Sequence, residues 1–205
     1  ADALVLDALQ ALREAPKASL APYSMHDTRP MLHEMRVFKS ACEVAVMKTA
    51  GRISAAAHKR AMQFVKPGCY EYHLEAELHH SFAMQGARTP AYSTIVGSGE
   101  NGCILHYTEN SAQIKDGDLV LVDAGCEYQG YAADITRTFP ANGTFSKPQR
   151  DIYEWVLKAQ EAVLTTLGPG STLGEAMQQS AEVITEGLVS LGLLGGTIAE
   201  NLQQE

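Results

Sequence analysis

The chain has 205 residues, of which 45% are hydrophobic and 20% are charged, the balance of a folded globular protein. Its formal net charge of −8 argues against nucleic-acid binding and against binding to an anionic membrane, because both need clustered lysines and arginines. No apolar run approaches the ~18 residues of a membrane span, and the four cysteines include no CxxC pair. We therefore expect a cytoplasmic protein with reduced cysteines and with no nucleic-acid or membrane partner.

The amino-terminal part, residues 1–35, is expected to be the tail of a preceding domain followed by a linker. Leucines at helical spacing predict a helix over residues 1–15, which Pro16 ends. Residues 16–30 contain three prolines and no hydrophobic period, which is typical of a linker. The main domain is therefore expected to occupy residues 36–205.

Four helices are predicted in this domain, in two similar pairs. Capping boxes at Ser40-x-x-Glu43, Ser146-x-x-Gln149 and Thr172-x-x-Glu175 mark three helix starts, because each cap and the residue three positions later satisfy free amides of the first turn. The expected spans are 40–67, 71–85, 146–167 and 172–193. The order of helix, Pro-Gly and helix occurs twice, so we infer an internal duplication whose second copy ends before its strands.

Between the two pairs, short apolar runs separated by Gly, Asn and Asp predict a mostly antiparallel sheet. The expected strands are 93–96, 103–106, 119–122 and 131–139. A turn centred on Gln129-Gly130 would place Gly125 opposite Asp134. Since side chains alternate along a strand, Asp123 would then share a face with Asp134, at ~7–8 Å between Cα atoms.

Asp123 and Asp134 are the strongest candidates for chemistry. Carboxylates flanked by apolar residues on a buried sheet cost several kcal/mol unless they are paired or bound to metal. Oxygen ligands favour a hard cation such as Mn²⁺ or Mg²⁺. The alternative interpretation is that both are ordinary strand-end or turn aspartates.

His106 is a second candidate, since it follows a glycine-rich loop and precedes a polar segment suited to lining a cleft. A hydrogen-bonded structural histidine is the alternative. The loop itself, residues 97–102, matches GxGxxG, but no helix is predicted after its third glycine, so dinucleotide binding is disfavoured. His79 and His80 belong to no HExxH motif and are attributed to a solvated helix face.

Three segments together carry a recognisable family pattern: IVGSGENGCILHYTEN at 95–110, DGDLVLVDAGCEY at 116–128 and GYAADITRTF at 130–139. They closely resemble the bacterial Xaa-Pro aminopeptidases (aminopeptidase P). The resemblance implies an α+β pita-bread fold, with two αβ halves related by a pseudo-twofold axis and, in the first half, a mostly antiparallel sheet flanked by helices. It also implies a dinuclear Mn²⁺ site in which Asp123 binds one metal ion and Asp134 bridges both. His106 would contact the substrate near the scissile bond and help to stabilise the tetrahedral intermediate.

The activity implied by the resemblance is removal of the first residue from peptides with proline in the second position, by attack of a metal-bridging hydroxide. The family takes a further ligand histidine and two glutamates from the second half of its domain, so this chain alone is expected to be inactive. When intact, the enzyme is expected to be a homodimer or homotetramer. Two alternatives stay open: a prolidase-like dipeptidase, which shares the DxG and DITRTF elements, and a non-catalytic pita-bread module that binds peptides. Retention of both aspartates disfavours the second.

Overall fold

The computed structural model describes residues 2–14 and 22–202. Contacts divide the chain into two compact units, residues 1–45 and 46–205. Among the described residues, no helix is both long and apolar enough to cross a membrane.

The described residues of the first unit include the helices α1 (Asp2–Glu14) and α2 (Arg29–Val37). The helix predicted before Pro16 is present. The predicted linker is only partly tested, because residues 15–21 lie outside the described residues. Its end was wrong: Pro30 does not belong to a linker but lies in the first turn of α2. Proline is well tolerated there, because the first amides of a helix have no intrahelical partner.

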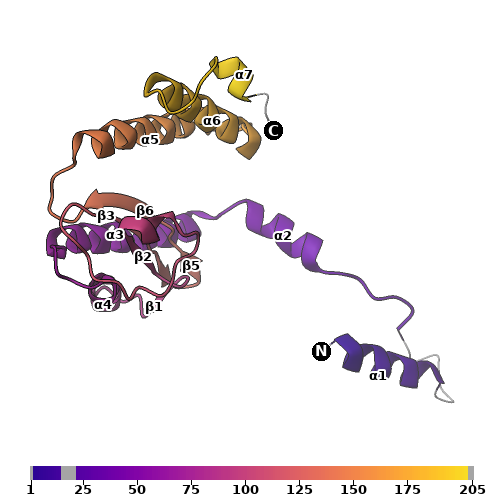
Figure 1. Cartoon of the computed structure of the whole chain (residues 1–205). Coiled ribbons are helices and arrows are strands. Elements are labelled where there is room, and N and C mark those ends of the chain that lie inside the picture. The colour runs from indigo at the N-terminus through magenta and orange to yellow at the C-terminus, as the bar shows by residue number, and fades with distance from the viewer. Residues whose placement is uncertain (1, 15–21, 203–205) are drawn as a thin grey trace. The chain divides into compact units, whose positions relative to one another are not determined.

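The second unit is built from two helix pairs and the strands between them (Figure 1). The first pair is α3 (Ala41–Phe64), whose first residues belong to the first unit, and α4 (Glu71–Met84). The second pair is α5 (Lys147–Thr166) and α6 (Leu173–Ser190), followed by a short α7 (Ile198–Leu202) that the sequence analysis did not anticipate. The three predicted capping boxes are confirmed by reciprocal contacts, as between Ser40 and Glu43.

In the part of the chain that the structure describes, the strands form two three-stranded antiparallel sheets, ordered β1-β4-β5 and β2-β3-β6. Their bounds are β1 Thr89–Pro90, β2 Ile95–Ser98, β3 Leu119–Asp123, β4 Cys126–Tyr128, β5 Tyr131–Ala132 and β6 Thr136–Pro140. The strand predicted at 131–139 is therefore divided into β5 and β6. The strand predicted at 103–106 is absent: a 3₁₀ helix, η2 (Gly99–Cys103), and an irregular loop occupy this part of the chain.

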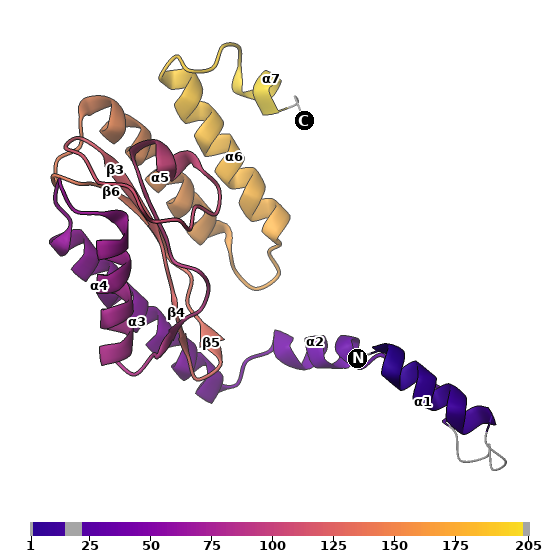
Figure 2. The ribbon, with the colours of Figure 1, turned by 60° about the horizontal axis from the view of Figure 1, so that its bottom comes forward.

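The hydrophobic core lies between the β2-β3-β6 sheet and the helices α3 and α4. Val120 and Val122 of β3 are fully buried there, together with Ile53 of α3 and Leu78 of α4. Because strand residues alternate, Leu119, Leu121 and Asp123 lie on the other face of β3. Helix α5 borders part of that other face, next to Leu119 of β3 and Thr138 of β6, and α6 lies alongside α5 (Figure 2).

Candidate functional site

The two candidate aspartates are placed by the β4–β5 hairpin and its extension into β3 and β6. Tyr128 pairs with Tyr131, as predicted, across a turn in which Gln129 has φ 51° and Gly130 has φ 84°. Two successive positive φ values are those of a type I′ turn, whose twist matches the strands beside it. The pairing continues with the same register to Asp123, which lies opposite Thr136, so Gly125 faces Asp134 as expected.

Gly125 allows the two strands to come together at this point. A Cβ atom added to Gly125 would lie 1.7 Å from the carbonyl oxygen of Ala133 and 2.4 Å from its carbonyl carbon. No side chain can be accommodated at that distance, so the glycine of the DxG element is required by backbone approach. The consequence is a close pairing of the segment that follows Asp123 with the segment that contains Asp134.

Tyr92 joins the two aspartates. Its hydroxyl lies 2.6 Å from Oδ1 of Asp123 and 3.1 Å from Oδ1 of Asp134. Both carboxylates therefore lie on one face, as the strand alternation predicts. Burial of the phenol, followed by its hydrogen bond with Asp123, raises the pKa of Tyr92 well above its ordinary value. Tyr92 therefore remains a neutral donor between two acceptor groups.

Sequence reasoning missed Tyr92. The only signal was its position just before the run that forms β2. No local pattern links Tyr92 to Asp123, which is 31 positions away, or to Asp134, which is 42 positions away. The link is purely tertiary.

The donor set of this site fits a hard cation. Asp123 is half-buried and Asp134 is exposed, so the carboxylates can be reached from solvent. Two adjacent carboxylates repel each other unless a cation or a proton lies between them, and carboxylate oxygens are the ligands preferred by Mn²⁺ and Mg²⁺. Within residues 2–14 and 22–202, no group of three or more His, Cys, Asp and Glu side chains is arranged to hold a metal ion. These residues therefore supply only part of a coordination shell.

A buried histidine of α3 contacts the backbone next to Asp123. His58 of α3 is only 2% exposed, and its Nε2 lies 2.9 Å from the carbonyl oxygen of Ala124, next to Asp123. Burial lowers the pKa of His58, and this effect outweighs the opposing hydrogen bond with Ala124. A neutral imidazole thus holds the backbone beside the metal-binding candidate.

His106 is exposed and has a left-handed backbone, with φ 56°. A residue other than glycine in this region costs energy, and such residues cluster at functional sites. Among the described residues, no hydrogen bond joins His106 to Asp123 or Asp134. The role expected for His106 therefore stays a prediction.

The remaining sequence motifs have structural contacts. The GxGxxG segment forms η2, and no α-helix opens after Gly102, so the geometry needed for a pyrophosphate site is lacking. On α4, Nε2 of His79 lies 2.8 Å from Oγ1 of Thr94. This places His79 in a tertiary contact rather than on a solvated face.

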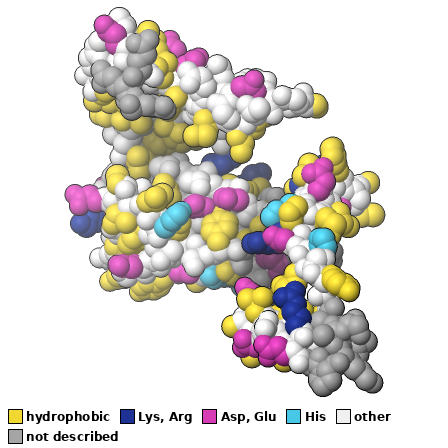
Figure 3. Space-filling view, turned by 90° about the vertical axis from the view of Figure 1, so that its right-hand side faces the viewer, with side chains coloured by type: hydrophobic (Ala, Val, Ile, Leu, Met, Phe, Trp, Pro, Cys, Tyr) yellow, Lys and Arg dark blue, Asp and Glu magenta, His cyan; other side chains and the backbone are white. Residues whose placement is uncertain are grey.

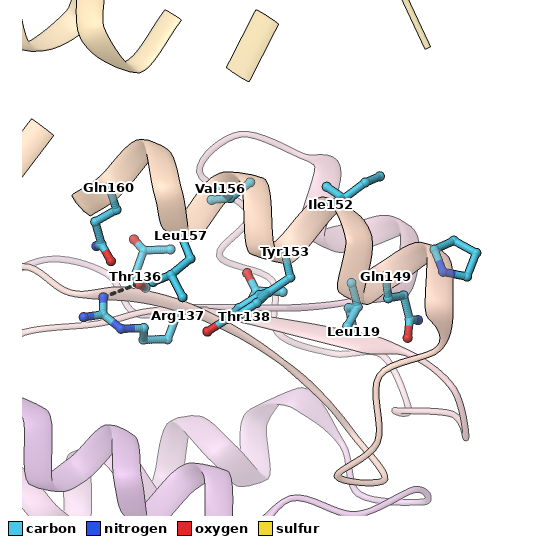
Figure 4. Close-up of a pocket in the computed structure, with 11 residues that line it drawn as sticks. Leu119, Thr136, Arg137, Thr138, Gln149, Ile152, Tyr153, Val156, Leu157 and Gln160 are labelled. Carbon is cyan, nitrogen blue, oxygen red and sulfur yellow. Dashed lines mark hydrogen bonds between the residues drawn. The ribbon is translucent and has the colours of Figure 1, made fainter. Parts of the chain in front are cut away.

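An apolar groove of about 640 Å³ lies between α5 and the strands β3 and β6 (Figure 4). Its walls include Leu119 of β3, Thr138 of β6 and Val156 of α5. Arg137 also lines it, but its Nη1 donates to the carbonyl oxygen of Thr136. Neither candidate aspartate lines this groove, although Thr136, the strand partner of Asp123, does.

Comparison with known proteins decides the family. Residues 45–202 match the model of metallopeptidase family M24. The chain belongs to metallopeptidase family M24. It is 54% identical over 205 residues to an Xaa-Pro aminopeptidase of Escherichia coli, covering 100% of this chain and 46% of that protein. It is 38% identical over 198 residues to an Xaa-Pro dipeptidase of Mus musculus, covering 93% of this chain and 40% of that protein.

Solved structures agree with this assignment. A zinc-substituted E. coli aminopeptidase P in complex with product superposes with a TM-score of 0.96 and 54% identity, over 100% of this chain and 47% of that chain. The resemblance to aminopeptidase P and the α+β pita-bread fold of this M24 chain are thereby confirmed. The chain spans about half the length of the relatives that it matches.

Proposed function

We propose that this M24 chain supplies part of the active site of a metal-dependent Xaa-Pro aminopeptidase, which removes the first residue from peptides with proline in the second position. The observation that carries the proposal is the pair Asp123 and Asp134, held on one accessible face by Tyr92. It occurs in a chain that resembles an Xaa-Pro aminopeptidase over its whole length. The lower identity to Xaa-Pro dipeptidases makes a dipeptidase the weaker alternative.

In this proposal, Asp123 and Asp134 hold a pair of divalent cations, with Mn²⁺ favoured by their oxygen ligands. When bound, such ions lower the pKa of water and polarise the scissile carbonyl group. Tyr92 orients the two carboxylates toward each other. His106 contacts the substrate and donates to the oxygen that becomes negatively charged in the transition state.

Further parts of the proposal concern the whole protein. We propose that additional ligands come from outside this chain, because two carboxylates alone bind a metal pair weakly. A cytoplasmic homodimer or homotetramer is the assembly proposed from the resemblance.

The proposal can be tested with a chimera in which this chain replaces the 205 matched residues of the E. coli relative. With Mn²⁺ added, the chimera should release the first residue from a tripeptide with proline in the second position, as measured by chromatography. The 205-residue chain by itself should be inactive. Asp123→Asn and Asp134→Asn should abolish release and lower the bound metal measured by mass spectrometry, and His106→Ala should lower kcat by about a hundredfold.

Three outcomes would contradict the proposal. The folded chimera could bind Mn²⁺ and leave the tripeptide intact. It could cleave only Xaa-Pro dipeptides, which would establish the dipeptidase alternative. Release that persists in both aspartate variants would remove these residues from the metal site.

A further inference from the structure

Glu71, the first residue of α4, is a fully buried carboxylate that the proposed chemistry does not use. It accepts five hydrogen bonds. The donors are the backbone amide and hydroxyl of Ser98, each at 2.7 Å, Nδ2 of Asn101 at 3.1 Å, the hydroxyl of Tyr107 at 2.8 Å and the backbone amide of Ala112 at 3.0 Å.

All five donors are neutral groups. Burial by itself would raise the pKa of the Glu71 carboxyl, but the hydrogen bonds from Ser98, Ala112 and Tyr107 outweigh it and lower the pKa below its ordinary value. A buried charge without a counter-ion is costly unless its lone pairs are satisfied. Glu71 therefore remains ionised because the surrounding loop supplies its donors.

These donors come from one stretch of chain, residues 98–112, which contains His106. Ser98 lies at the start of the stretch, Tyr107 directly follows His106, and Ala112 lies at the end. The backbone amide of Glu71 also donates to the carbonyl oxygen of Ala112, at 3.0 Å. One side chain therefore closes the loop at both ends and holds its middle beside His106.

A second glutamate, one turn further along α4, holds the same loop through Asn110. Nδ2 of Asn110 donates to Oε2 of Glu75 at 3.0 Å and to the carbonyl oxygen of Thr94 at 2.9 Å, and Oδ1 accepts from the amide of Val96 at 2.9 Å. Asn110 is buried and left-handed, with φ 48°.

The loop thus contains two left-handed residues other than glycine, His106 and Asn110, which need tertiary contacts to persist. Asn110 has its own contacts with β2 and Glu75. The side chain of His106 is exposed, so its conformation depends on the contacts of its neighbour Tyr107 with Glu71. The buried carboxylate is the shared anchor.

We infer that Glu71 is a positioning residue, which fixes the loop 98–112 so that His106 is presented to the substrate. This inference rests on the proposed function for the role of His106. Glu71 itself lies in the interior and touches neither substrate nor metal. It acts by restricting the backbone on both sides of His106.

The test uses Glu71→Gln in the chimera, because glutamine keeps the shape of the side chain and loses two acceptor positions to an amide group. Glu77→Gln, on the same helix, is the matched control, since the partly exposed Glu77 pairs with Arg60 and, among the described residues, has no contact with the loop 98–112. Tyr107→Phe is a second, milder variant: it removes one donor and leaves the other four.

Hydrogen exchange gives the readout that does not depend on activity. Glu71→Gln should speed exchange of the amides in residues 98–112 by about tenfold or more, because hydrogen bonds to a charged group are lost. Amides of β3 and β6 should be unchanged, and Glu77→Gln should have no effect on the loop. Equal exchange of this loop in Glu71→Gln, Tyr107→Phe and the unmutated chimera would overturn the inference even in an inactive protein.

Kinetics test the link to His106. Glu71→Gln should lower kcat by about tenfold, with a smaller change in KM, and should leave the bound metal unchanged. In a His106→Ala background the same substitution should cost less than about threefold, because the two residues act through one interaction. If the kcat losses of Glu71→Gln and His106→Ala were fully additive, Glu71 would stabilise the fold without acting through His106. Failure of the unmutated chimera to cleave would refute the proposed function and leave the exchange result to decide on Glu71.

Discussion

Gly125→Ala is the substitution whose effect the structure specifies best. The added methyl group would lie 1.7 Å from the carbonyl oxygen of Ala133, which is 1.7 Å short of the 3.4 Å at which ordinary contact begins. The obstacle is backbone, which cannot rotate away as a side chain can. The two strands must therefore separate beside Asp123 and Asp134.

The separation breaks the hydrogen bonds on either side of Gly125, from the amide of Ala124 to Ile135 at 3.1 Å and from the amide of Ala133 to Cys126 at 2.9 Å. Each is worth about 1 kcal/mol, and forcing an extra carbon into a packed site costs about 1–3 kcal/mol. We therefore expect Gly125→Ala to lower the free energy of unfolding of the chimera by about 3–5 kcal/mol.

The assay is urea unfolding followed by circular dichroism, together with Mn²⁺ titration. Gly51→Ala is the matched control: Gly51 lies in α3 with nothing within 4 Å of an added Cβ, so the substitution should stabilise by about 0.5–1 kcal/mol. Mn²⁺ affinity should fall in Gly125→Ala and not in Gly51→Ala. A loss of stability below about 1 kcal/mol with unchanged Mn²⁺ affinity would refute the reasoning about backbone approach.

Three further predictions concern other sites. Tyr92→Phe should destabilise the metal-free chimera by about 1–2 kcal/mol in urea unfolding, because the donor between Asp123 and Asp134 is lost. Added Mn²⁺ should reduce this loss of stability, and an equal loss with and without Mn²⁺ would contradict the prediction. The folded state favours the ionised form of Glu71. The free energy of unfolding of the unmutated protein should therefore exceed that of Glu71→Gln by its full amount above pH 4.5, and the difference should shrink as the pH falls through the lowered pKa. A difference that grows as the pH falls would contradict this. The 205-residue chain should self-associate in sedimentation velocity through the apolar groove, and Val156→Glu on α5 should weaken the association; a monomeric unmutated chain would contradict this.

The surface supports the last of these predictions. Large apolar side chains of α5 that line the groove are exposed, with Ile152 at 47%, Val156 at 52% and Leu157 at 38%. Figure 3 shows hydrophobic side chains on the helical layer formed by α5–α7, uppermost in the view. Exposed patches of this kind mark surfaces that bind another protein surface or aggregate.

Much of the local structure could be predicted because its signals are local. Capping boxes such as Ser146 with Gln149 act over four residues, and the turn at Gln129-Gly130 sets the register of its hairpin. That register, with side-chain alternation, was enough to place Asp123 and Asp134 on one face. The same logic does not predict α2, because proline is a signal both of a linker and of a first helical turn, and Pro30 lies in such a turn.

The prediction of a strand at 103–106 was wrong for a different reason. Its apolar residues Cys103, Ile104 and Leu105 have strand-like character, yet all three are exposed in the structure. The contacts of Glu71 with Ser98, 27 positions away, and Ala112, 41 positions away, hold this stretch as a loop. Tertiary hydrogen bonds to a buried charge outweigh a local preference worth fractions of a kcal/mol per residue.

The sequence by itself thus determined the family, the helices α3 to α6 and the shared face of Asp123 and Asp134, since these follow from motifs, caps and turns that act between near neighbours in the chain. Only the tertiary structure decided that Tyr92 joins the aspartates, that Gly125 must lack a side chain and that Glu71 anchors the His106 loop. Each of these depends on atoms brought together by packing, and their energies exist only once the chain is folded.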